Sequence, residues 1–70
     1  MEQLYINIKN RRLELGMSMR ELAAKSGYTD HTTIAKIEKG EVDISIGRLK
    51  QIAAALDTTP VKLTGWLEED

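Results

Sequence analysis

The spacing of apolar residues along the chain predicts five short helices separated by polar turns. Most of the apolar segments are bounded by a glycine, a serine or a threonine, residue types that commonly cap or end helices. The first helix is expected from about residue 4 to residue 15. It carries Leu4, Ile8 and Leu15 at near-helical spacing, and Gly16 stops it.

The second and third predicted helices follow each other closely. The second begins with a capping box, in which the Ser18 hydroxyl accepts from a first-turn amide and Glu21 bonds back to the serine amide, and Gly27 ends it. The third covers about residues 31 to 39, with Thr29 or Asp30 as its N-cap. One face of the second helix carries Met19, Leu22, Ala23 and Ser26.

The last two helices have equally clear starting signals. Ser45 caps the fourth, and Thr59 followed by Pro60 begins the fifth, because proline is favoured at a first helical position. The apolar positions of the fourth helix are Ile46, Leu49, Ile52, Ala53 and Leu56, and those of the fifth are Val61, Leu63 and Leu67. No segment alternates in the manner of a strand, so the predicted fold class is all-α.

Length and composition limit the classes of function. A chain of 70 residues, 41% hydrophobic and 30% charged, is typical of one small folded domain. It contains no cysteine, which excludes thiol catalysis, disulfides and cysteine-bound zinc. The longest apolar run, from Ile52 to Leu56, is too short to cross a membrane, and no signal peptide is evident at the N-terminus. We therefore expect a cytoplasmic protein without cofactor, metal or evident small-molecule ligand, and not an enzyme.

The net charge of −1 does not by itself favour a nucleic-acid partner. However, three of the eleven acidic residues, Glu68, Glu69 and Asp70, end the chain. Between Lys9 and Lys39, seven basic residues stand against four acidic ones. The charge distribution thus permits DNA binding without demonstrating it.

The second and third predicted helices together form the pattern of a helix-turn-helix. Gly27 permits a sharp reversal, and Ala23 is small enough for the two helices to cross closely. In the third helix Ile34 and Ile37 define a buried side, and the opposite side carries Thr32, Ala35, Lys36 and Lys39, with His31 at its margin. Such a helix fits the DNA major groove, although many solvated helix faces have the same pattern.

Several motifs occur together in order along the chain. They are Ile8 to Arg12, Gly16 to Ser18, Glu21 to Ala23, Gly27, Ile34 to Gly40, and Leu49 to Leu56. Over residues 6–65 this set resembles the helix-turn-helix domain of phage repressors, Cro-type proteins and xenobiotic-response-element regulators. The resemblance implies a compact five-helix domain of the lambda-repressor type that binds operator DNA, usually as a dimer.

The chain departs from that family pattern in two places. The stretch from Gly27 to Ile34 is one residue longer than usual, with Asp30 or His31 as the apparent insertion. The loop after the third helix carries Glu41 and Asp43, where relatives often have basic residues that contact phosphates. Acidic groups facing phosphate would weaken binding.

The resemblance implies roles for particular residues. Arg12 and Glu38 match positions that pair between the first and third helices. The expected DNA-binding residues are Ser18, Met19, Arg20, His31, Thr32, Thr33, Lys36 and Lys39. Of these, Thr32 and Lys36 are the leading candidates for contacts to bases or backbone. Met19 offers only its backbone amide. His31 is a DNA contact, part of the cap, or a residue placed there only by the shifted turn, and these alternatives stay open.

The leading hypothesis is a sequence-specific transcriptional regulator, a repressor, whose domain covers residues 1–67 and is followed by an acidic tail or linker start at 68–70. The alternative is an antitoxin-like or scaffold module of the same fold with weakened DNA binding. Pairing through Val61, Trp66 and Leu67 would be weak, so we expect a monomer at micromolar concentration that dimerises mainly on DNA. The equal alternative for Trp66 is that it folds over the core.

Overall fold

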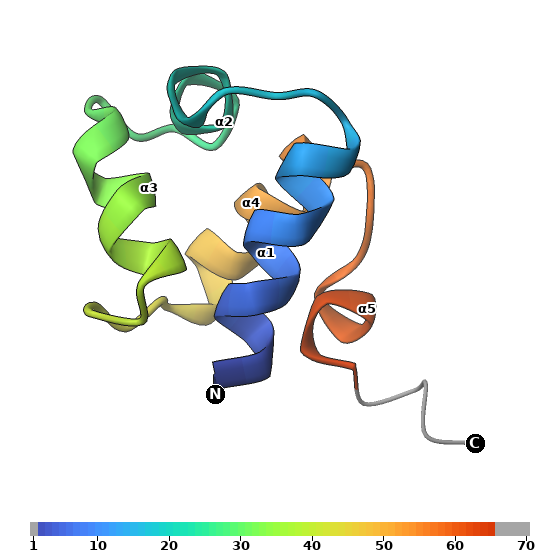
Figure 1. Ribbon diagram of the computed structural model, residues 1–70. Coiled ribbons are helices and arrows are strands. Elements are labelled where there is room, and N and C mark those ends of the chain that lie inside the picture. Colours follow the sequence, from blue (N-terminus) through green and yellow to red (C-terminus); the bar gives the residue numbers. More distant parts are fainter. Residues whose placement is uncertain (1, 66–70) are drawn as a thin grey trace.

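The computed structural model describes residues 2–65 and contains five helices (Figure 1). They are α1 (Glu2–Glu14), α2 (Met19–Lys25), α3 (His31–Glu38), α4 (Ile46–Ala55) and α5 (Pro60–Thr64). No strand occurs within these residues, which confirms the all-α prediction. The expected boundary between a domain at 1–67 and an acidic tail at 68–70 lies outside the described residues.

Side-chain caps begin four of the five helices. The Ser18 hydroxyl accepts from the Glu21 amide at 3.0 Å, and the Glu21 carboxylate accepts from the Ser18 amide at 3.0 Å, so the capping box is present. Asp30, and not Thr29, caps α3. Ser45 and Thr59 cap α4 and α5 in the same way, and Pro60 occupies the first turn of α5.

The core combines one side of every helix, and its innermost side chains are Ile8, Leu22, Ile34, Ile37, Ile52 and Leu56. Two apolar residues of the predicted helices lie outside the core. Leu15 is 41% exposed, because α1 ends at Glu14 and helical periodicity no longer sets its direction. Ile46 is 71% exposed, since it is the first residue of α4 and precedes the buried stripe of that helix. The α1 stripe continues instead through Arg12, which is buried.

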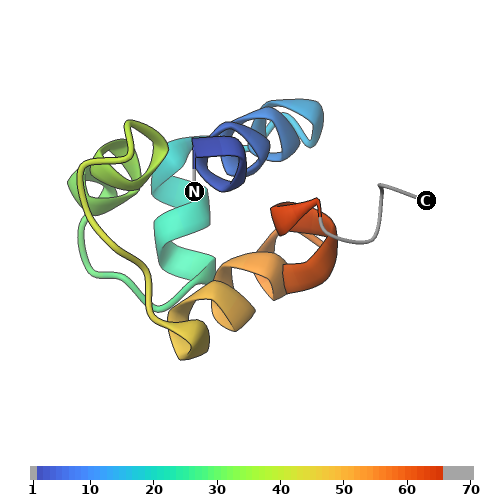
Figure 2. The same ribbon diagram turned by 90° about the horizontal axis from the view of Figure 1, so that it is seen from below.

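α2 and α3 lie at an angle to each other (Figure 1), α2 runs through the middle of the molecule when it is seen from below (Figure 2), and the two make the most extensive contact of any helix pair. Ala23 is buried at this contact, and Gly27 has a φ of 83°, which only glycine adopts easily. The Tyr28 amide donates to the Ala23 carbonyl at 2.9 Å and closes the turn. The predicted helix-turn-helix is confirmed.

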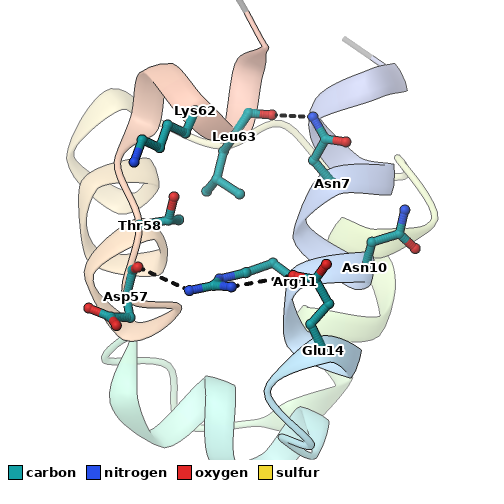
Figure 3. A pocket seen from close by; sticks show the side chains of 8 residues that line it. All are labelled: Asn7, Asn10, Arg11, Glu14, Asp57, Thr58, Lys62 and Leu63. Carbon is teal, nitrogen blue, oxygen red and sulfur yellow. Dashed lines mark hydrogen bonds and ion pairs between the residues drawn. The ribbon is translucent and has the colours of Figure 1, made fainter. Parts of the chain in front are cut away.

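On another side of the molecule, α1 is fastened to the end of α4 and to α5 (Figure 3). Arg11 Nε donates to the Leu56 carbonyl at 2.9 Å and its Nη2 to the Asp57 carbonyl at 3.2 Å, which satisfies carbonyls at the end of α4. Asn7 Nδ2 donates to the Leu63 carbonyl at 2.7 Å. These bonds border an open hollow of about 430 Å³, and they commit Asn7 and Arg11 to holding the helices together.

Candidate nucleic-acid interface

The third helix presents two contrasting sides. Ile34 and Ile37 are at most 1% exposed and anchor α3 in the core. Thr32 and Lys36 are exposed, and Lys39, which directly follows the helix, is exposed as well. Thr33 and His31 are half-buried at the margins. The structure therefore presents a polar and cationic side of α3 to the surroundings.

The one acidic residue of α3 is withdrawn from this surface by an ion pair with α1. Arg12 Nε lies 2.6 Å from Glu38 Oε2, and Arg12 Nη2 lies 3.1 Å from Glu38 Oε1. The two side chains are 8% and 3% exposed. Arg12 Nη1 also donates to the Met17 carbonyl at 2.9 Å. The structure thus brings together the two residues expected to pair and leaves α3 without an exposed carboxylate.

The N-terminus of α3 is organised by Asp30. Its Oδ1 accepts from the Thr32 amide at 2.9 Å and from the Thr32 hydroxyl at 2.7 Å. The Thr32 hydroxyl is therefore engaged in the cap. His31 is the first residue of the helix, with Nδ1 3.6 Å from Asp30 Oδ1. α3 begins directly after this capped turn, and its residues Ile34 and Ile37 are buried in the core.

The cap makes stability sensitive to acid. The two hydrogen bonds from Thr32, first the backbone amide and then the hydroxyl, lower the pKa of Asp30 from its ordinary value of 3.8. A carboxylate with a lowered pKa in the folded state stabilises that state above the unfolded pKa, and the contribution disappears as pH falls through the folded pKa. We expect Asp30→Asn, which keeps a capping oxygen, to have a lower melting temperature than the parent near neutral pH and to approach the parent below pH 3.8. Melting followed by circular dichroism checks this, and a pH-independent difference would contradict it.

The residues at the start of α2 lie close to the start of α3. The Ser18 hydroxyl is used in the capping box, and Met19 is half-buried against the core. Arg20 is exposed and, with His31, borders a hollow of about 250 Å³ between the two helix starts. The other lining residues are Ala23, Ala24, Tyr28, Thr29 and Asp30. Of Ser18, Met19 and Arg20, which were expected to bind DNA, Arg20 is the one with an exposed and positively charged side chain.

A comparison with models of protein families identifies the family to which this arrangement belongs. Residues 8–63 match the model described as "Helix-turn-helix". The chain belongs to the helix-turn-helix family. As a member of this family it is a DNA-binding transcriptional regulator and not an enzyme. The resemblance inferred from the sequence motifs is thereby confirmed.

Two solved structures are similar to this helix-turn-helix protein. The restriction-modification controller protein C.AhdI from Aeromonas hydrophila is 28% identical, with 87% of this chain and 91% of that chain covered and a TM-score of 0.82. The wild-type restriction-modification controller protein C.Esp1396I is 32% identical, with 97% of this chain and 87% of that chain covered and the same TM-score of 0.82. A comparison with curated proteins gives no significant match.

The loop after α3 combines buried and exposed residues in this helix-turn-helix protein. Val42 and Ile44 pack against the core, whereas Glu41 and Asp43 are exposed. The Glu41 amide donates to the Lys36 carbonyl at 2.9 Å, which fastens the loop to the end of α3. The two acidic residues therefore stand next to the C-terminal end of the cationic helix surface.

The residues proposed for pairing are only partly described. Val61 is half-buried on α5, while Trp66 and Leu67 lie outside the described residues.

None of the helices described in residues 2–65 has the length and apolar character that crossing a membrane requires.

The sequence patterns missed Arg48, which contacts the turn of the helix-turn-helix from α4. Its Nη1 donates to the Ser26 carbonyl at 3.2 Å, and its guanidinium lies 4.3 Å from the centre of the Tyr28 ring. These partners lie about twenty residues earlier in the chain, so no helical spacing could reveal them. The one available signal is an arginine close after the Ser45 cap, which is too common to be specific.

Proposed function

We propose that this protein is a sequence-specific regulator that places α3 in the major groove of operator DNA and represses transcription. The observation that carries the proposal is the surface of α3. Lys36 and Lys39 are exposed there, while the carboxylate of Glu38 is 3% exposed and paired with Arg12. A helix that is anchored on one side and cationic on the other satisfies the shape and charge of the major groove.

Contacts to phosphates would hold α3 in register. Arg20 stands beside the start of α3 and Lys39 stands beyond its end, so two cations bracket the helix. Phosphate contacts at both ends fix orientation, while residues between them contact bases. Thr33 and Lys36 are proposed for that central role. Thr32, whose hydroxyl is bound to Asp30, and His31 are proposed to support the helix start and to contact DNA at its edge.

We propose that two copies act together on DNA. A single recognition helix contacts only a few base pairs, whereas a symmetric pair spans two half-sites about one helical turn apart. Pairing through the region of Val61 on α5 would be weak in free solution and would be completed on the operator. The similarity to two restriction-modification controller proteins supports a regulatory role, and makes control of restriction-modification genes the context to test first.

Selection of bound duplexes from random DNA tests this function, after a gel-shift measurement with a random duplex at low salt. We expect retention of the random duplex, and enrichment of a two-fold symmetric sequence with half-sites about 10 base pairs apart. Retention without an enriched sequence would contradict sequence specificity. Failure to retain any duplex at low salt would favour the alternative of an antitoxin-like or scaffold module, which the exposed Glu41 and Asp43 would suit.

A further inference from the structure

Arg48 on α4 makes two contacts with the turn between α2 and α3 and one with a neighbouring residue of its own helix. Its Nη1 donates to the Ser26 carbonyl at 3.2 Å, and the same nitrogen donates to Gln51 Oε1 at 3.0 Å. Its guanidinium carbon lies 4.3 Å from the centre of the Tyr28 ring, within the range of a cation–π contact. The half-buried guanidinium is therefore held by groups inside the protein.

Gly27 shows how closely Arg48 packs on this turn. A Cβ built at Gly27 would lie 3.0 Å from Arg48 Nη1. Glycine is therefore favoured at position 27 for two reasons. A side chain there would crowd Arg48, and the backbone φ of 83° is one that glycine adopts easily. The guanidinium occupies the space beside Gly27, between the end of α2 and the ring of Tyr28.

Tyr28 is the anchor of a very short connection. Only Tyr28, Thr29 and Asp30 separate Gly27 from the first residue of α3. Tyr28 packs against the core and is half-buried, whereas Thr29 and Asp30 are exposed. A displacement of the Tyr28 ring would therefore be passed to the start of α3 within three residues.

We infer that Arg48 is a positioning residue for DNA recognition: by clamping Ser26, Gly27 and Tyr28 onto α4, it sets the orientation in which α3 is presented to DNA. This inference rests on the function proposed above. Arginine suits this role because its planar guanidinium stacks on a ring and donates hydrogen bonds in its plane at the same time. Lysine keeps the charge but not this combination, so charge and geometry can be separated by mutation.

The experiment compares Arg48→Ala and Arg48→Lys with the parent on two duplexes, the one selected by the parent and a random one of equal length. We expect both variants to bind the selected duplex about 10-fold more weakly, as for one badly placed base contact. Binding to the random duplex and the slope of log affinity against log salt should stay unchanged. Lys50→Ala, which removes an exposed charge from the same helix, is the control and should bind as the parent does.

The opposite pattern would overturn the inference. If Arg48 contacts phosphate directly, Arg48→Ala weakens binding to both duplexes and makes the slope of log affinity against log salt shallower by about 0.9. In that case Arg48→Lys restores binding. Hydrogen exchange of the Tyr28 amide, which donates to Ala23, gives a readout that needs no DNA. We expect Arg48→Lys to speed this exchange about 10-fold relative to amides in α1. Unchanged exchange in Arg48→Lys would refute the clamp. If exchange is faster in Arg48→Lys but the parent protein binds no DNA, the clamp is supported and only the proposed function is refuted.

Discussion

Replacing Glu38 by alanine is expected to lower the free energy of unfolding by about 3–5 kcal/mol. The reason is the buried ion pair with Arg12, whose side chains are 8% and 3% exposed. Alanine would leave the guanidinium of Arg12 buried with only the Met17 carbonyl as a hydrogen-bonding partner. A domain of this size has a total stability of about 4–10 kcal/mol, so much of it would be lost. Urea unfolding followed by circular dichroism measures the effect.

A second ion pair on α1 provides the matched control. Arg11 and Glu14 lie 3.3 Å apart, but the Glu14 side chain is 68% exposed. Glu14→Ala should therefore change the free energy of unfolding by less than about 1 kcal/mol. A double variant, Arg12→Met with Glu38→Leu, should recover much of the loss from Glu38→Ala because it leaves no unpaired buried charge. Equal stability of Glu38→Ala and Glu14→Ala would show that the Arg12–Glu38 pair is not buried in solution.

The helices could be predicted because their signals are local. A capping side chain and the amide that it accepts from lie two or three residues apart, as in Ser18 with Glu21, so they are visible in the sequence. The exposure of Leu15 and Ile46 could not be predicted, for the complementary reason. Both stand at helix ends, where the chain direction changes and periodicity stops fixing which way a side chain points. The choice between Thr29 and Asp30 as the α3 cap likewise needed the geometry of the turn.

The candidate site was predictable only in part. Lys36 follows from the position of Ile34 and Ile37 on the opposite side of α3, and this is a local pattern. The engagement of the Thr32 hydroxyl by Asp30 depends on side-chain direction within one turn, which spacing does not specify. Arg48 was missed because its contact with Tyr28 joins α4 to the turn between α2 and α3, and the sequence cannot orient these two parts relative to each other. The residues that hold the site are therefore harder to find than those that face DNA.

Lys36→Ala is expected to weaken binding to the selected operator about 10-fold without changing the melting temperature. Lys36 is exposed on the outer side of α3, and its side chain takes no part in the core. A contact to a phosphate would weaken binding to every duplex and make the slope of log affinity against log salt shallower by about 0.9. A contact to a base edge would instead relax the preference at one operator position. Gel-shift titrations at several salt concentrations, on selected and random duplexes, distinguish the two.

The control for this substitution is Lys62→Ala, which also removes an exposed cation, in this case from α5, next to the hollow between α1 and α5 (Figure 3). Both variants change the net charge by the same amount, so any long-range electrostatic effect on DNA is matched between them. Only Lys36→Ala should weaken DNA binding by more than that shared effect, because short-range contacts in the groove depend on the position of a charge and not on the total charge. If the two variants weaken binding equally, Lys36 makes no direct contact, and recognition must be assigned to another surface of the protein.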